Sequence, residues 1–436
     1  MKSGALFAII KIRFMKFIRK VLPNKVRVIL APMAEAKSVN LLVLAATGSK
    51  YETKEINGIS HFIEHLFFKG TKSRPSAGQI HAELDAIGSE HNAFTSREVT
   101  GYLIKSASKH FSFVLDIVSD IIVNPLFDPE EIEKEKKVIL EEIRMYNDNP
   151  MSRIFDAFNK LAYGNQPAGM PLDGYENTIK SITKKQIVNY KKSYYVGSNL
   201  TVVISGDISR IKFKEIENKF SQVKTGRAPA KKPPIEKQSL PGVYFKHQDT
   251  DQTHLIIGSR SYNLFNQKKY ASFLLDIILG GTASSRFFKE LREKLGLAYY
   301  VKTAFLPETD TGQFILRAGV SSSRLGLAVD KVVEILKDVK NNGISKKELD
   351  LAKENFRGRL ALSFETSDEV ADFFGEQEIF GLKIATPNEL LKKVLDVKPE
   401  DVQKIANEMF QPNKINFALI GPHKNPELYG KKLANL

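Results

Sequence analysis

Two histidines and a glutamate lie close together near the start of the chain, in the segment His61-Phe62-Ile63-Glu64-His65. If this segment is helical, His61 and His65 share one face, with Cβ atoms about 5–6 Å apart. Two imidazoles so placed can bind one metal ion at distances of about 2.0–2.1 Å. Glu64 lies beside them and can accept a proton from a water molecule on that metal. This HxxEH motif, the reverse of HExxH, predicts a hydrolytic metal site.

Chance rarely produces this motif. The chain has 8 histidines in 436 residues, so about 0.01 accidental HxxEH matches are expected per chain. The structural alternative is an exposed helix with incidental histidines. It is disfavoured by the apolar neighbours of the motif, among them Ile59, Leu66 and Phe67. Burial of two histidines and a glutamate among such residues costs free energy unless a partner compensates.

A third metal ligand is expected, because a catalytic zinc usually has three protein ligands and one open position. Residues 128–147 begin with Asp128-Pro129, which is typical of a helix start, and are rich in glutamate. The candidates are Glu130, Glu131, Glu133, Glu135, Glu141 and Glu142. Glu135 and Glu142 share one helical face, whereas Glu141 lies about 100° further round. Spacing alone leaves the choice of ligand open.

The sequence resembles the pitrilysin/insulinase family of zinc metallopeptidases, in the branch of mitochondrial processing peptidase and its bacterial relatives. In that family a glutamate follows the motif at a fixed spacing, written HxxEH-x76-E, and the chain has this spacing between His65 and Glu142. The resemblance implies that His61, His65 and Glu142 bind one Zn²⁺ per chain. It also implies that Glu64 is the general base and that Glu135 supports catalysis.

Two further segments extend the resemblance. Asn92-Ala93-Phe94-Thr95 resembles the edge strand of the family, against which a peptide substrate lies as an added strand. Backbone hydrogen bonds then supply much of the affinity. Residues 291–299 (LREKLGLAY) resemble the REKxGLxY segment of the family. The resemblance implies that Arg292 and Tyr299 reach the zinc site and contact the substrate carbonyl, where a donor stabilises developing negative charge.

The chain that positions these residues is long enough to form at least two domains. Residues 225–241 have the composition of a linker, with several prolines and no apolar periodicity. Residues 183–206 and 398–421 match in pattern without a gap, so that one constant offset relates them. Each is an amphipathic helix, a turn and an apolar strand that ends in glycine. We therefore predict two homologous halves: a catalytic zinc-binding half (1–224), the linker (225–241) and a non-catalytic substrate clamp (242–436).

Strand and helix patterns do not alternate as strictly as a doubly wound sheet requires. We predict an α+β fold in which each half is a mostly antiparallel sheet covered by helices, and the resemblance implies that the halves form a clamshell. The predicted strands are 27–30, 40–46, 201–205, 242–246, 253–259 and 416–420. The same constant offset carries the motif onto residues 276–280 (DIILG), which contain no histidine. The second half is therefore predicted to hold no metal.

Composition excludes several kinds of site. The chain has no cysteine, which excludes disulfides, thiolate nucleophiles and cysteine-bound zinc. The net charge of +15 is spread along the chain and accompanies no nucleic-acid-binding motif, so we predict no nucleic-acid function. The apolar run at residues 5–10 is too short for a signal peptide or a membrane helix. We predict a cytoplasmic protein without an integral membrane segment, and interpret residues 1–14 as an extension or a mis-assigned start.

The main functional hypothesis is a zinc-dependent endopeptidase that hydrolyses unfolded peptides or presequence-like segments. The alternative is a non-catalytic scaffold or partner subunit of a peptidase-like complex. The complete set of His61, Glu64, His65 and Glu142 argues against that alternative. The resemblance suggests that two chains associate, as a homodimer or as a heterodimer with a related subunit. A third possibility, a basic protein that binds membrane surfaces or nucleic acid, predicts salt-sensitive binding and no hydrolysis.

Overall fold

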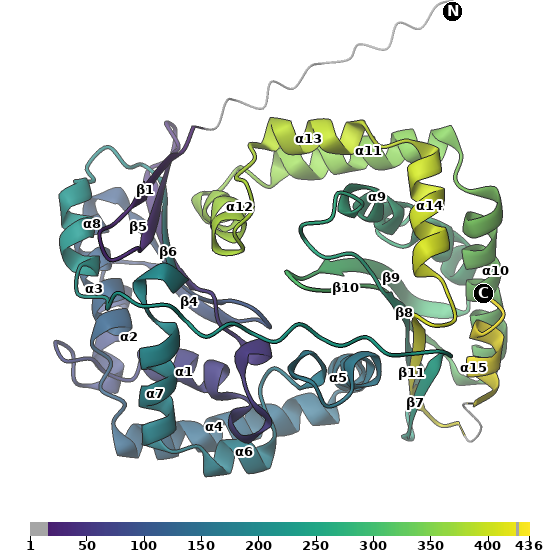
Figure 1. The fold of residues 1–436 in the computed structure, drawn as a ribbon, viewed down its shortest axis with the longest axis horizontal. Helices are drawn as coiled ribbons and strands as arrows, with labels where there is room; N and C mark the ends of the chain where they lie inside the picture. The colour runs from purple at the N-terminus through teal and green to yellow at the C-terminus, as the bar shows by residue number, and fades with distance from the viewer. Residues whose placement is uncertain (1–15, 424–426) are drawn as a thin grey trace, which may run out of the picture.

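The computed structural model describes residues 16–423 and 427–436, and our interpretation of residues 1–14 lies outside them. Two sheets lie side by side, each with its own helices (Figure 1). The first has the order β1-β2-β6-β3-β5-β4. It consists of β1 (Ile18–Val21), β2 (Arg27–Pro32), β3 (Ser38–Ala45), β4 (Glu90–Thr95), β5 (Thr100–Ala107) and β6 (Leu200–Gly206).

The second sheet has the order β7-β11-β8-β10-β9. Its strands are β7 (Gly242–His247), β8 (Gln252–Arg260), β9 (Ala298–Pro307), β10 (Gly312–Ser321) and β11 (Ile415–Gly421). Strand pairing is antiparallel except between β2 and β6 and between β7 and β11. The predicted α+β fold with two mostly antiparallel sheets is confirmed.

The second sheet repeats the strand order of the first sheet without β1. Adding 215 to the bounds of β2 and β6 gives those of β7 and β11. The same offset carries helix α7 (Lys184–Tyr194) onto α14 (Pro399–Met409). Residues 221–241 form no helix or strand, which is in keeping with the predicted linker, while the domain boundaries at 224 and 241 stay a prediction.

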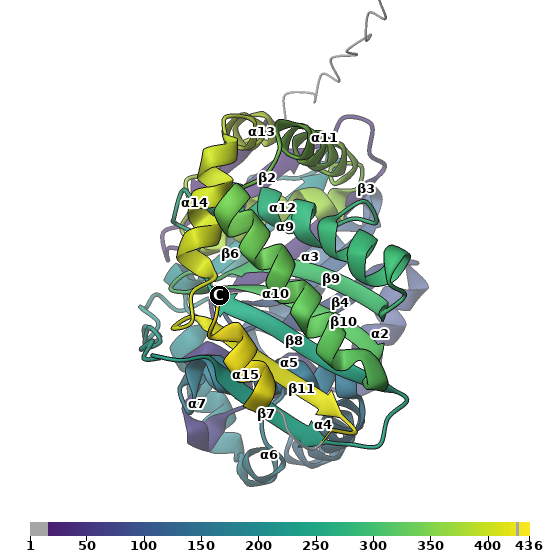
Figure 2. The ribbon, with the colours of Figure 1, turned by 90° about the vertical axis from the view of Figure 1, so that its right-hand side faces the viewer.

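The remaining helices surround the two sheets. In the first half they are α1 (Ile59–Phe67), α2 (Ala77–Ala86), α3 (Phe111–Val123), α4 (Pro129–Asp148), α5 (Pro150–Tyr163), α6 (Glu176–Ser181) and α8 (Phe213–Phe220). In the second half they are α9 (Lys269–Leu279), α10 (Leu325–Asn342), α11 (Lys346–Leu362), α12 (Ser367–Ile379), α13 (Pro387–Leu395) and α15 (Glu427–Leu433). Figure 2 shows α10 and α15 in front of the second sheet. None of the described helices is long and apolar enough to cross a membrane.

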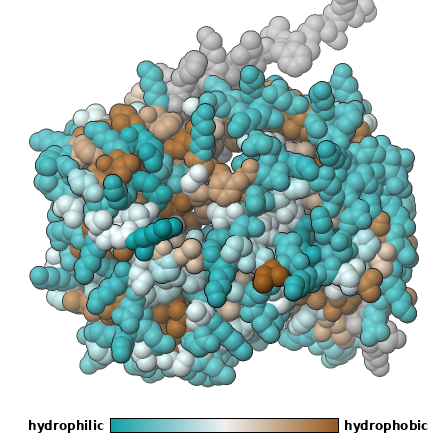
Figure 3. All heavy atoms as spheres, viewed as in Figure 1, coloured by the Kyte–Doolittle hydropathy of each residue, from teal (hydrophilic) through white to brown (hydrophobic). Residues whose placement is uncertain are grey.

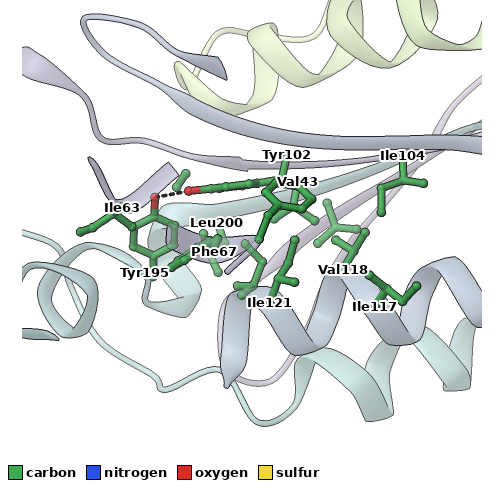
Figure 4. Packing of buried hydrophobic residues seen from close by; sticks show 14 of the residues in the cluster. Val43, Ile63, Phe67, Tyr102, Ile104, Ile117, Val118, Ile121, Tyr195 and Leu200 are labelled. Carbon is green, nitrogen blue, oxygen red and sulfur yellow. Dashed lines mark hydrogen bonds between the residues drawn. The ribbon is translucent and has the colours of Figure 1, made fainter. Parts of the chain in front are cut away.

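Each half has its own large hydrophobic core between its sheet and its helices. Figure 4 shows part of the first core, where Phe67 of α1 packs beside Tyr195 and near Ile121 of α3. The hydroxyls of Tyr195 and Tyr102 are hydrogen-bonded at 2.8 Å. Most residues on the face shown in Figure 3 are hydrophilic. The core of the first half thus lies directly behind α1, the helix that carries the HxxEH motif.

The two halves exchange one helix each. Helix α12 packs against β3 and β6 of the first sheet, where Val370 and Phe374 contact Leu42 and Val203. Conversely, α5 packs against β8 and β11 of the second sheet. Both faces of each sheet are therefore covered, which explains why β3 and β6 are almost continuously apolar in sequence.

A buried ion-pair network also joins the halves, at the turn between β4 and β5. The amine of Lys50, only 1% exposed, lies 3.0 Å from Glu98 and 2.7 Å from Glu308, and also pairs with Asp310. Lys231, in the segment that connects the halves, pairs with Glu98 at 3.0 Å and with Asp310. The turn between β9 and β10 is therefore fixed to the turn that follows the edge strand β4.

Candidate metal centre

Helix α1 begins at a position that only glycine fills without strain. Gly58 precedes it with φ of 96°, and a Cβ there would lie 2.7 Å from the carbonyl oxygen of Asp173. The buried carboxylate of Glu52 accepts hydrogen bonds from the backbone N–H groups of Gly58 (2.7 Å) and Ser60 (2.8 Å). A carboxylate at this end of a helix satisfies free N–H groups and complements the helix dipole. Glu52 was not predicted from the sequence: the Asn57-Gly58 turn indicates where α1 begins, but not which residue accepts these hydrogen bonds.

The sequence-predicted ligands converge from α1 and α4. The Nε2 atoms of His61 and His65 are 3.2 Å apart. Oε2 of Glu142 lies 3.7 Å from Nε2 of His61 and 3.6 Å from Nε2 of His65. A tetrahedral metal with bonds of 2.0–2.2 Å needs ligand atoms about 3.3–3.6 Å apart. The three side chains therefore fit a single zinc ion.

The structure also distinguishes Glu142 from the other glutamates of α4. Ile132, Ile139 and Ile143 are buried and fix which side of α4 faces the core. Glu141 points away: its side chain is 71% exposed and pairs with Arg144 on the same helix. Of the glutamates that the spacing left open, Glu142 is the one that joins the two histidines.

Among the described residues, one other acidic cluster has the spacing of a metal site: Glu98, Glu308 and Asp310. The amines of Lys50 and Lys231 already pair with these carboxylates. Two ammonium groups thus supply the positive charge there, so this cluster belongs to the ion-pair network and not to a second metal centre.

Glu135 orients His65. Its Oε2 lies 3.0 Å from Nδ1 of His65, and its Oε1 accepts from Lys69 at 2.8 Å. Burial raises the pKa of Glu135, but the bonds from His65 and Lys69 outweigh it and lower that pKa. Glu135 therefore accepts the Nδ1–H of His65, which leaves the lone pair of Nε2 directed toward the other ligands. Such carboxylate–histidine pairs are common around bound zinc.

The two histidines differ in their protonation. Burial and the neighbouring His65 lower the pKa of His61 to about 4, so its ring is neutral at neutral pH, as a metal ligand must be. Its Nδ1 is buried without a hydrogen-bond partner. Burial also lowers the pKa of His65, but the bond to Glu135 and the carboxylates of Glu142 and Glu64 outweigh it and raise that pKa.

Glu64 lies between the metal ligands and the edge strand. Its Oε2 accepts a hydrogen bond of 2.5 Å from the hydroxyl of Thr95, the last residue of β4. Burial raises the pKa of Glu64 in spite of that bond. A carboxylate with a raised pKa, next to a position for an activated water, is suited to accept and return a proton.

Strand β4 ends the first sheet and pairs only with β5 among the described strands. Along it Ala93 and Thr95 are half-buried toward α1, whereas Asn92 and Phe94 are exposed. The amide oxygen of Asn92 accepts from the backbone N–H of Ala93 at 2.9 Å. The edge is thus open to an added strand.

Arg292 and Tyr299 lie together in the second half. Arg292, in a π-helical turn (Phe288–Lys294), donates to the backbone oxygen of Tyr299 and lies over the ring of Phe288. Tyr299 is 58% exposed. In the described part of the chain, no hydrogen bond or ion pair joins either residue to the predicted metal ligands or to Glu64. Their contact with the substrate carbonyl stays a prediction.

Comparison with known proteins agrees with this geometry. Residues 27–175 match the family described as Insulinase (Peptidase family M16), and residues 181–356 match the Peptidase M16 inactive domain. A Bacillus subtilis protein called uncharacterized zinc protease YmxG is 35% identical over 92% of this chain and 97% of its own length. An uncharacterized zinc protease of Rickettsia felis is 34% identical over the same shares of the two chains.

Solved structures show the same fold. A protease from Helicobacter pylori superimposes with a TM-score of 0.87 and 24% identity, covering 94% of this chain and 100% of that chain. A peptidase M16 inactive domain from Pseudomonas fluorescens gives 0.86 with 19% identity, covering 94% and 99%. Together with the site formed by His61, His65 and Glu142, these matches show that the chain belongs to peptidase family M16 and is a zinc protease with an N-terminal catalytic and a C-terminal inactive domain.

Proposed function

We propose that this chain is a zinc-dependent endopeptidase that cleaves unfolded peptides or presequence-like segments. One observation carries the proposal. Three side chains with the spacing of a zinc site, His61, His65 and Glu142, lie beside Glu64. Glu64 in turn accepts a hydrogen bond from Thr95 of the edge strand β4. One Zn²⁺ per chain is expected. The positions that match the metal centre in the second half contain no histidine.

In this proposal Glu64 is the general base. When bound, zinc lowers the pKa of a water molecule and polarises the scissile carbonyl. Glu64 accepts the proton of the attacking water at its carboxylate and returns it to the leaving amine. Thr95 holds that carboxylate in place through its hydroxyl. Glu135, which also pairs with Lys69, keeps His65 in the tautomer whose Nε2 is free to bind the metal.

The substrate would bind as a strand added to β4, along Asn92, Ala93, Phe94 and Thr95. The open edge of β4 supports this proposal. Because an added strand is held largely through backbone hydrogen bonds, it must be extended, and this favours unfolded segments over folded proteins. A bound peptide would displace the hydrogen bond that the backbone N–H of Ala93 donates to the side-chain oxygen of Asn92. Arg292 and Tyr299 are proposed to contact the carbonyl of the bound peptide and stabilise its developing charge.

The remaining parts of the proposal concern organisation. Residues 1–224 form the catalytic half, 225–241 the linker and 242–436 the substrate clamp. The pairing of two chains, as a homodimer or with a related subunit, and the cytoplasmic location stay predictions from the sequence.

The test is cleavage of a mixed library of unstructured peptides, read by mass spectrometry. The purified chain is assayed alone, with a zinc chelator, and after zinc is restored. Cleavage that stops with the chelator and returns with zinc is expected, and the fragments give the sequence preference. If the chain binds stoichiometric zinc and cleaves nothing, the scaffold or partner-subunit alternative replaces the proposal.

A further inference from the structure

A small cavity of about 250 Å³ lies in the first half, between the end of α3, helix α7 and the segment after α8. Of its twelve lining residues, seven are apolar, three are lysines and none is acidic. The lysines are Lys191 and Lys192 of α7 and Lys224. This cavity therefore combines an apolar lining with positive charge at its wall.

Lys191 is the lysine placed most deeply at this cavity. It is half-buried, and its amine donates one hydrogen bond, of 3.0 Å, to the backbone oxygen of Val123 at the end of α3. An ammonium group has three N–H donors. In the described part of the chain, no ion pair involves any of the three lysines. Burial, together with the charges of Lys224 and Lys192, lowers the pKa of Lys191 to about 8. The half-buried amine of Lys191 thus lies beside two exposed lysines and has no acidic partner among the described residues.

The larger cavity in the second half, of about 760 Å³, is different. Its lining contains five acidic and three basic side chains, and several of these lie in ion pairs. Arg286 pairs with Asp338 and Glu348, and Lys331 pairs with Glu334. That lining has an excess of acidic side chains and does not favour an anion, whereas the smaller cavity, with three lysines and no acid, does.

We propose that the cavity beside Lys191 binds a small organic anion with an apolar body, of the class of short- to medium-chain carboxylates. The anionic group would accept the free donors of Lys191, with Lys192 and Lys224 close by, and the hydrocarbon would lie among Leu126 and Val188. A charge-assisted hydrogen bond of this kind is stronger than a neutral one. The proposal does not depend on the peptidase function.

The site would lie close behind the metal centre. Two of its lining residues, Phe127 and Tyr195, pack against Phe67 of α1, with ring centroids 6.0 Å and 5.0 Å apart. Figure 4 shows Tyr195 and Phe67 side by side in the core. Phe67 follows His65 closely on the same helix. An occupant of this cavity would therefore contact residues that pack against the HxxEH helix.

Calorimetric titration of the purified chain with hexanoate, acetate and hexylammonium, at constant ionic strength, tests the proposal. We expect saturable 1:1 binding of hexanoate. Affinity should fall about fourfold for each CH₂ removed, and hexylammonium should not bind. Lys191→Met should weaken hexanoate binding at least about tenfold, as expected for the loss of a charge-assisted hydrogen bond. Lys185→Met, at an exposed position of the same helix, should leave hexanoate binding unchanged.

A second measurement covers the case in which Lys191→Met fails to fold. In the unaltered chain, hexanoate should protect Lys191 from reductive methylation, read by mass spectrometry, while Lys185 stays reactive. Three results would overturn the proposal: no saturable hexanoate binding, an equal loss of affinity in both lysine variants, or equal affinity for acetate and hexanoate.

Discussion

In the first half, His61 of α1 and Glu142 of α4 lie 3.7 Å apart and can share a metal ion. The equivalent positions of the second half hold Asp276 of α9, at the offset of 215, and Arg359 of α11, at the offset of 217 that relates the first residues of α4 and α11. Burial raises the pKa of Asp276, and the hydrogen bond of 2.5 Å from Thr303 and the charge of Arg359 offset that rise only in part. Arg359 also donates to the backbone of Gly281. One fold thus places a metal centre between two helices in one half, and a carboxylate and a guanidinium in the other.

The comparison shows what a helix pair needs in order to hold a metal. The second half keeps the two helices, the sheet and the strand order, but the positions of the three ligands hold Asp276, Gly280 and Arg359. A guanidinium stays charged at any physiological pH, so Arg359 offsets part of the cost of burying Asp276. The second half thus has the same helix pair but no histidine at these positions.

The largest effect that would sharpen this comparison is expected at Glu64, whose equivalent in the second half is Leu279. Glu64→Gln should lower kcat by about 10²–10⁴-fold, because the amide cannot accept the proton. Zinc content, measured by atomic emission, should not change. The matched control is Glu141→Gln on the exposed side of α4, which should keep full activity. Full activity in Glu64→Gln would sink the proposed mechanism.

The next largest effect is expected at the contact between the halves. Lys50→Met removes a buried ammonium that faces three carboxylates. An uncompensated buried charge typically costs about 3–5 kcal/mol, so the free energy of unfolding in urea should fall by about that amount. Adding Glu98→Gln should restore part of the loss, because one negative charge is removed as well. If the single variant is as stable as the parent, the network does not hold the halves together.

A smaller effect is expected at Glu135, which has Ala352 as its equivalent in the inactive half at the offset of 217 between α4 and α11. Glu135→Gln should weaken zinc binding by about 10–100-fold, as is typical when the carboxylate behind a ligating histidine is lost. Competition with a fluorescent chelator measures this affinity. Glu133→Gln, on the same helix and paired only with Lys136, is the control. Unchanged zinc affinity in Glu135→Gln would assign Glu135 a purely structural role.

The smallest effect is expected at the position that replaces the third ligand. Arg359→Gln removes the cation that lies near Asp276, but Arg359 is exposed, so solvent weakens the interaction. The free energy of unfolding should fall by less than about 1 kcal/mol, and zinc content and kcat should not change. A large loss of zinc in this variant would contradict the separation of the two halves into one that binds metal and one that does not.

Much of this fold could be predicted from the sequence. The constant offset between two gapless segments located β6 and β11 as well as α7 and α14, because a repeat keeps the spacing of its elements. The motif and the family spacing also identified the three side chains that the structure brings together. Helical periodicity alone could not separate Glu135, Glu141 and Glu142, because it gives angles around one helix and not the direction of its neighbour.

Other features depend on contacts between distant segments, which periodicity does not contain. The patterns of α5 and α12 show that each has an apolar face, but not that this face covers the sheet of the other half. The network around Lys50 joins segments from opposite halves of the chain, since Asp310 is 260 residues away. Glu52 lies outside α1 and has no preferred spacing to it. Such partners become visible only when the chain is folded.

The exchange of α5 and α12 has a consequence for how the chain can be divided. A cut within 225–241 would leave the first fragment without the helix that covers Leu42 and Val203, and the second without the helix that covers Ile256 and Ala418. Each fragment would then expose an apolar sheet face that matches a helix of the other. Separately made fragments are therefore expected to associate with each other into a non-covalent complex. A chain that is cut within 225–241 should likewise remain one complex in solution.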